Sequence, residues 1–91
     1  MNQSDHQRSV RSLNRHIGEK ARQRRETLSL PLARVASELG ISKSKMAKYE
    51  DGRERIVSSD LAKLSVILSV PVAYFFEEGA SDRSAGSRTL H

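Results

Sequence analysis

Between residues 42 and 55 the sequence gathers side chains that can bond to the oxygen atoms of an anion. The set consists of Ser42, Lys43, Ser44, Lys45, Lys48, Arg53 and Arg55. Lys43 and Ser44 open an expected helix and Lys48 lies one turn further along it, so their side chains line up to bond phosphates or guanine edges. The alternative is that these lysines and arginines are simply hydrated, as most basic surface residues are.

The net charge supports a polyanionic partner and places it in one part of the chain. The 91 residues carry a formal charge of +5, and the sequence pI is about 10.1. Of the 16 lysines and arginines, 13 lie at or before Arg55. A basic balance of this kind favours binding to nucleic acid or another polyanion.

Residues for catalysis or metal binding lack the necessary spacing. His6, His16 and His91 are scattered, the five glycines stand singly, and there is no cysteine. Glu77 and Glu78 are adjacent, but we interpret them as a hydrated helix end rather than an acid–base pair. We therefore expect no enzyme activity, no metal, no cofactor and no small-molecule substrate.

Targeting and membrane signals are also missing from the sequence. The longest apolar run, residues 70–76, is far shorter than the roughly 18 residues of a membrane span. Residues 1–12 contain two arginines but no apolar stretch of a secretory signal. The absence of cysteine suits a compartment that is not oxidising. We expect a cytoplasmic protein that does not contact a membrane.

The apolar spacing predicts one small all-α domain over residues 13–79. Residues 1–12 and 80–91 are rich in small polar side chains, and we expect them to be flexible tails because they bury too little apolar surface to offset their ordering entropy. Five short helices are expected in order, over about 13–27, 31–39, 43–50, a fourth from about 58, and a last one from 71.

Particular residues are expected to begin these helices or to face the core. Leu13 and Ile17 are expected on the inner stripe of the first helix. Pro31 suits the first turn of the second helix, which leaves Ser29 or Leu30 as its cap. The expected caps of the third and fourth helices are Ser42 and either Ser58 or Ser59.

Residues 32–52 have the spacing of a helix-turn-helix. Ala36 is small where a second helix must approach closely, and Gly40, four residues later, can take the positive φ of the turn. The expected inward positions are all apolar: Val35, Leu39, Ile41, Met46 and Tyr49. In this motif the second helix enters the major groove with its N-terminal residues near base edges. An interaction-only helix pair remains the alternative.

From about Ile17 to Glu78 the sequence resembles the phage-repressor or Xre-type (Cro-like) helix-turn-helix family. Four segments carry the resemblance: Ile17-Gly18 with Arg22 and Arg25, then residues 36–42, 48–52 and 70–77. They occur in order and at the family's spacing. The resemblance implies a compact five-helix DNA-binding domain, bacterial or phage-encoded, in which the second and third helices form the helix-turn-helix.

The resemblance also implies roles for individual residues. It implies base-facing positions for Lys43, Ser44 and Lys48, and a partly buried ion pair that joins Arg25 to Glu50. The alternative for Arg25 is a hydrated side chain in a basic run. The function expected is sequence-specific regulation of transcription at a double-stranded DNA operator, by a repressor that acts as a homodimer. The expected phosphate contacts come from Lys45, Arg53 and Arg55.

Two features depart from the family pattern and keep a second hypothesis open. The family opens its second helix with Ser or Thr followed by Gln, which hold a phosphate, whereas this sequence has Pro31-Leu32. Of the adjacent Tyr74, Phe75 and Phe76, one ring must point away from the core and is either partly exposed or part of a dimer contact. An exposed Leu32 and this aromatic ring would instead suit an antitoxin-like or anti-repressor module with a vestigial helix-turn-helix.

Overall fold

The computed structural model describes residues 3–78, with side chains described from Val10 onward. The elements in order are α1 (Gln3–Thr27), α2 (Leu32–Leu39), α3 (Lys43–Asp51), α4 (Ser58–Ile67) and the 3-10 helix η1 (Val72–Phe76). No strand occurs among these residues. The expected all-α fold is therefore confirmed, but its five helices are four α-helices and one short 3-10 helix. The C-terminal segment 80–91 lies outside the described residues.

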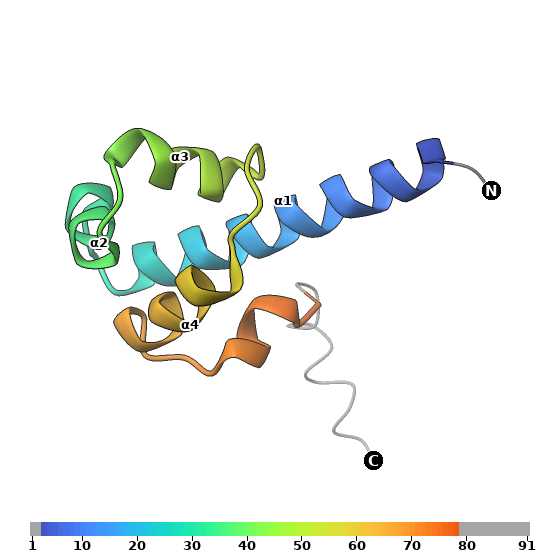
Figure 1. The fold of residues 1–91 in the computed structure, drawn as a ribbon. Helices are drawn as coiled ribbons and strands as arrows, with labels where there is room; N and C mark the ends of the chain where they lie inside the picture. The colour runs from blue at the N-terminus through green and yellow to red at the C-terminus, as the bar shows by residue number, and fades with distance from the viewer. Residues whose placement is uncertain (1–2, 79–91) are drawn as a thin grey trace, which may run out of the picture.

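α1 runs through the middle of the molecule and organises the other elements. In Figure 1, α3 lies above α1, while α4 and η1 lie below it. α1 contacts both α3 and η1, and α2 closes one end by packing against both α3 and α4. None of the helices in residues 3–78 is both long enough and apolar enough to cross a membrane.

α1 begins at Gln3, ten residues before the expected start near Leu13. Residues 3–12, expected as part of a flexible tail, are helical in the structure. They contain neither proline nor glycine, and a helix that is already nucleated extends at little cost because each added residue gains one hydrogen bond. Leu13 is 47% exposed, so its expected place on the inner stripe was wrong, whereas Ile17, one turn later, is buried.

The core takes apolar side chains from every element. Its buried members are Ile17, Ala21, Val35, Ala36, Leu39, Met46, Tyr49, Leu61, Leu64, Leu68 and Phe75. The inward positions expected for the helix-turn-helix belong to this set, apart from Ile41, which packs against it half-buried. The three neighbouring rings separate as geometry requires: Phe75 is fully buried, Tyr74 is half-buried and Phe76 is 47% exposed.

Two glycines bring α3 and the following loop into backbone contact with α1. A Cβ built on Gly18 would strike the carbonyl oxygen of Tyr49 and lie 2.7 Å from that of Glu50. A Cβ built on Gly52 would lie 2.6 Å from the Cα of Arg15, and Gly52 also has a φ of +77°. Both positions therefore require glycine, and together they fix how closely α3 lies on α1.

The starts of α2 and α4 also differ from the expected ones. Pro31 is the N-cap of α2 rather than a residue of its first turn, because its ψ of 148° is extended. Val57, not Ser58 or Ser59, is the N-cap of α4. Neither helix has a side-chain cap. At both starts the cap residue has an extended backbone, a conformation that apolar residues and proline adopt readily.

Candidate nucleic-acid interface

The turn between α2 and α3 sets the direction of α3. Gly40 has a φ of 80°, and the N–H groups of Gly40 and Ile41 donate to the carbonyls of Ser37 (3.1 Å) and Ala36 (3.0 Å). These bonds satisfy the last carbonyls of α2 as the chain reverses. Ser42 then caps α3, as expected, because its Oγ accepts a hydrogen bond from the N–H of Lys45 at 3.0 Å.

The outer face of α3 presents side chains that have no acidic partner. Met46, Tyr49 and Glu50 face inward and are buried, whereas Lys43, Ser44 and Lys48 are exposed. Among residues 10–78, neither Lys43 nor Lys48 forms an ion pair. Two ammonium groups and a hydroxyl are therefore available to a ligand on the face opposite the core.

Of the other basic residues between 42 and 55, Lys45 lies in α3 and Arg53 and Arg55 lie in the loop that follows, and two of the three are already paired. Lys45 Nζ lies 3.4 Å from Glu54 Oε2 and 5.6 Å from the centre of the Tyr49 ring. Arg53 donates to Asp51 at 3.0 Å. Arg55 is exposed. Exposed ion pairs contribute only about 0–1 kcal/mol, so an anionic ligand can displace these carboxylates at little cost.

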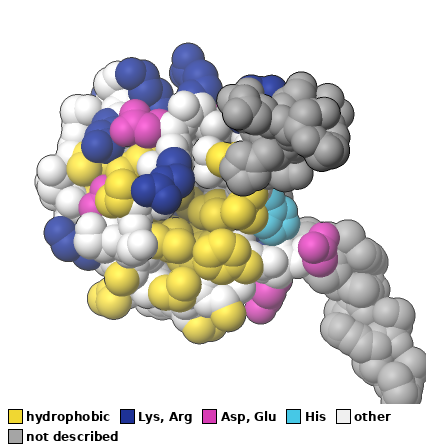
Figure 2. Space-filling model, turned by 45° about the vertical axis from the view of Figure 1, so that its right-hand side comes forward, with side chains coloured by type: hydrophobic (Ala, Val, Ile, Leu, Met, Phe, Trp, Pro, Cys, Tyr) yellow, Lys and Arg dark blue, Asp and Glu magenta, His cyan; other side chains and the backbone are white. Residues whose placement is uncertain are grey.

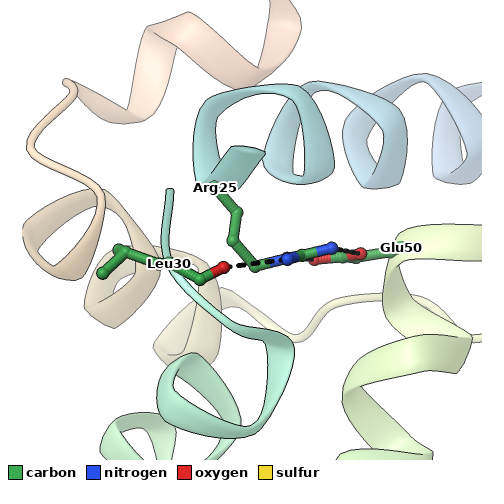
Figure 3. Close-up of polar contacts among 3 residues, drawn as sticks. All are labelled: Arg25, Leu30 and Glu50. Carbon is green, nitrogen blue, oxygen red and sulfur yellow. Dashed lines mark hydrogen bonds and ion pairs between the residues drawn. The ribbon is translucent and has the colours of Figure 1, made fainter. Parts of the chain in front are cut away.

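A buried ion pair holds α3 against α1 (Figure 3). Arg25 Nε donates to Glu50 Oε2 at 2.7 Å and Arg25 NH2 donates to Glu50 Oε1 at 3.0 Å, while NH1 donates to the carbonyl of Leu30 at 2.9 Å. The two side chains are only 13% and 5% exposed. The hydrogen bond to Glu50 raises the pKa of Arg25, against an opposing effect of burial. The pair expected from the resemblance is present, and Arg25 is not a hydrated side chain.

A second polar contact, which the sequence analysis did not identify, joins α3 to α4. The buried Tyr49 hydroxyl donates to Asp60 Oδ2 at 2.6 Å. Burial first, and then this hydrogen bond, raises the pKa of Tyr49 above its usual value of 10. The sequence pattern placed Tyr49 at an inward position but could not indicate its partner, because Asp60 lies eleven residues away in another helix.

We expect Tyr49→Phe to lower the free energy of unfolding by roughly 1.5–3 kcal/mol, the contribution of a hydrogen bond to a charged group. Urea denaturation followed by circular dichroism measures the change. Tyr74→Phe is the matched control, because Tyr74 is half-buried and its hydroxyl makes no hydrogen bond to the side chains or backbone of residues 10–78. Equal losses for the two variants would show that the Tyr49–Asp60 bond does not stabilise the fold.

α1 also holds the opposite side of the domain. Arg24 Nε donates to the carbonyl of Leu68 at 2.8 Å, at the end of α4. His16 Nε2 lies 2.6 Å from the carbonyl oxygen of Glu77, after η1, so the ring donates there. Lys20 lies over the Tyr74 ring, 4.3 Å from its centre. These three contacts hold the end of α4 and the segment around η1 against α1.

The start of α2 differs from the expectation that Leu32 is exposed. Leu32 is half-buried and packs against the core. The carbonyl of Pro31 accepts from the N–H groups of Arg34 (3.0 Å) and Val35 (3.3 Å), and no side chain caps the first turn. Leu32 is thus part of the hydrophobic packing and only partly available to the partner of the antitoxin-like hypothesis, whereas Phe76 is 47% exposed.

Basic and hydrophobic side chains gather in different parts of one face of the molecule. Figure 2 shows Lys and Arg side chains along the upper edge, the side on which α3 lies, with others at the centre and the left, and hydrophobic side chains from the centre to the lower edge. The exposed large hydrophobic residues are Val10, Leu13, Val57, Val66, Val72 and Phe76. A helix-turn-helix whose second helix presents basic side chains to solvent is the arrangement of a DNA-binding domain.

The comparisons with known proteins agree with this class. The sequence profile of the helix-turn-helix domain family matches residues 16–73, so the chain belongs to this family. It is 38% identical over 71 residues to an uncharacterized transcriptional regulator in the ATPase CF(0) region of Rhodospirillum rubrum, covering 78% of this chain and 66% of that protein. It is 39% identical over 67 residues to an uncharacterized HTH-type transcriptional regulator of Sinorhizobium medicae, covering 74% of this chain and 48% of that protein.

Two solved structures share the fold. The clp gene regulator ClgR from C. glutamicum superposes with a TM-score of 0.67 at 25% identity, over 87% of this chain and 96% of that chain. The restriction-modification controller protein C.AhdI from Aeromonas hydrophila gives a TM-score of 0.66 at 22% identity, over 71% of this chain and 97% of that chain. The chain spans 66% and 48% of the lengths of the two curated relatives described above.

Proposed function

We propose that this protein is a sequence-specific transcriptional regulator that inserts α3 into the major groove of double-stranded DNA. The observation that carries the proposal is the two-sided character of α3. One side is fixed by buried Met46 and Tyr49 and by the ion pair of Glu50, and the other presents Lys43, Ser44 and Lys48 to solvent. A rigid helix with free donors at its leading end suits the reading of guanine and thymine acceptors.

The phosphate contacts of this complex come from residues beside α3. Lys45, Arg53 and Arg55 lie on α3 or in the loop that follows, where the DNA backbone passes when α3 lies in the groove. Lys45 and Arg53 exchange their exposed carboxylate partners for phosphates. The uncapped N–H groups at the start of α2 offer a further anion-binding position, although Pro31 and Leu32 supply no side-chain bond there.

We infer that the protein acts as a homodimer and as a cytoplasmic repressor. The exposed Phe76, Val72 and Val66 belong to η1 and α4, away from α3, so a second copy bound there leaves both α3 helices free. Two-fold symmetric regulators read half-sites about 34 Å apart. Such a dimer bound across a promoter represses by occupying it, with no further contact required.

Selection of bound fragments from genomic DNA tests the proposed function. The full chain is incubated with sheared bacterial DNA at moderate salt, and retained fragments are sequenced. The proposal predicts one enriched motif with two-fold symmetry and retardation of that duplex in a gel shift. Recovery of fragments that share no motif, from a chain that melts cooperatively, would contradict sequence-specific binding.

The phosphate contacts predict a steep dependence of affinity on salt. Each phosphate contact contributes about −0.9 to the slope of log K against log salt concentration, so Lys45, Arg53 and Arg55 give roughly −3 for each domain bound. We expect Arg55→Ala to make this slope shallower by about 1 per domain while the preferred motif stays the same. Fluorescence anisotropy across a salt series measures it, and an unchanged slope would exclude Arg55 from the interface.

A further inference from the structure

The first turns of α1 extend beyond the remaining elements, next to the loop that follows α3. We define the overhang as residues 3–14, the part of α1 before Arg15. Figure 1 shows this part of α1 leaving the bundle past the loop between α3 and α4. At 1.5 Å per residue, its twelve residues measure about 18 Å.

The backbone contact at Gly52 fixes where the overhang begins. A Cβ on Gly52 would lie 2.6 Å from the Cα and 2.9 Å from the N of Arg15, so the chain leaving α3 lies directly on α1 at this residue. The next residue, Arg53, has a side chain that is 67% exposed. The side chains of Arg15 and Arg53 therefore start from neighbouring points of the backbone. The basic surface of the loop continues onto α1.

Arg11 extends the basic surface of the loop along the overhang. Residues 11, 15 and 18 follow spacings of four and three, so they share the side of α1 that meets α3 at Gly18. Arg11 and Arg15 are exposed, and neither forms an ion pair among residues 10–78. Like charges one turn apart destabilise a helix slightly, and an anion bound between them removes that repulsion.

We propose that the overhang, together with Arg15 at its base, is a second contact with the DNA backbone, in which Arg11 and Arg15 bind phosphates of the duplex that flanks the bases read by α3. This inference rests on the proposed function. An overhang of about 18 Å matches the axial rise of roughly five base pairs at 3.4 Å each. The contact carries charge but no base readout, so it makes affinity depend on the length of the flanking duplex and not on its sequence.

The test compares two lengths of the duplex recovered by genomic selection: the motif alone, and the motif extended by about ten base pairs on each side. Anisotropy titrations across a salt series use wild type, Arg11→Ala/Arg15→Ala and Arg11→Lys/Arg15→Lys. Wild type should bind the extended duplex more tightly. The alanine variant should lose this advantage, and its slope on the extended duplex should be shallower by roughly 2 for each domain bound. The lysine variant should behave as wild type, because phosphate accepts either cation.

The controls separate failure of this inference from failure of the proposed function. Lys63→Ala removes one exposed charge from α4 and should leave the length advantage intact. If the alanine variant keeps the full slope and length advantage while Lys48→Ala loses the motif preference, only the role of the overhang is overturned. If wild type binds neither duplex, both are overturned.

Discussion

Arg25→Ala should lower the free energy of unfolding by about 3–5 kcal/mol, the usual cost of removing one partner of a buried ion pair. Arg25 makes two hydrogen bonds to Glu50 and a third to the Leu30 carbonyl. Its loss leaves the Glu50 carboxylate, whose side chain is 5% exposed, buried without its counter-charge. Since whole domains are stable by only about 5–15 kcal/mol, the thermal midpoint should fall by many degrees or the fold should be lost.

A double replacement shows whether the stranded charge is the cause. Arg25→Met/Glu50→Met removes both charges and keeps apolar volume, and such exchanges are often neutral or stabilising. The double variant should therefore melt well above Arg25→Ala when both are followed by circular dichroism. If Arg25→Ala loses less than about 1 kcal/mol, the pair behaves as an exposed one and does not anchor α3.

Gly18→Ala should destabilise the fold by about 2 kcal/mol or more, because a clash with backbone atoms reaches or exceeds the upper end of the usual overpacking cost, although helix propensity alone predicts the opposite sign. Alanine in a helix interior is favoured over glycine by about 1 kcal/mol. Here the added methyl strikes the carbonyl of Tyr49 and lies 2.7 Å from that of Glu50. Because these atoms are backbone, relief requires α3 to move away from α1, and overpacking of this kind costs about 1–3 kcal/mol and sometimes more.

Gly40→Ala is the matched control for the steric argument. Gly40 has a φ of 80°, but a Cβ there meets nothing within 4 Å. Its replacement should cost only the left-handed backbone strain of about 1–2 kcal/mol. Urea denaturation of both variants should place Gly18→Ala below Gly40→Ala. If Gly18→Ala is instead more stable than Gly40→Ala, α1 and α3 are not in backbone contact at Gly18.

The local pattern of the sequence was sufficient to predict the helix-turn-helix. Apolar spacing identified Val35, Leu39 and Met46 as buried, and Ser42 as a cap, because these depend on neighbours within a few residues along the chain. The family resemblance supplied the pairing of Arg25 with Glu50, twenty-five residues apart, which no local spacing indicates.

What the sequence could not predict depends on contacts between distant segments. The Tyr49–Asp60 bond, the hydrogen bond of Arg24 to Leu68 and the meeting of Gly52 with Arg15 all join different elements. The length of α1 was missed for another reason: a polar helix continuing from a packed one needs no hydrophobic stripe. The meeting of Gly52 with Arg15 and the length of α1 are also the features that carry the basic surface onto α1.

The most direct test of the central claim is the motif preference of Lys48→Ala. Lys48 is exposed on the outer face of α3 and forms no ion pair among residues 10–78. Anisotropy at one salt concentration gives the ratio of affinities for the recovered motif and for a scrambled duplex of equal length. If α3 reads bases, this ratio should fall roughly 5- to 150-fold in Lys48→Ala, as expected for about 1–3 kcal/mol of lost discrimination, and should not change in Lys63→Ala. An unchanged ratio in Lys48→Ala, or an equal fall in both variants, would contradict base reading by Lys48 from α3.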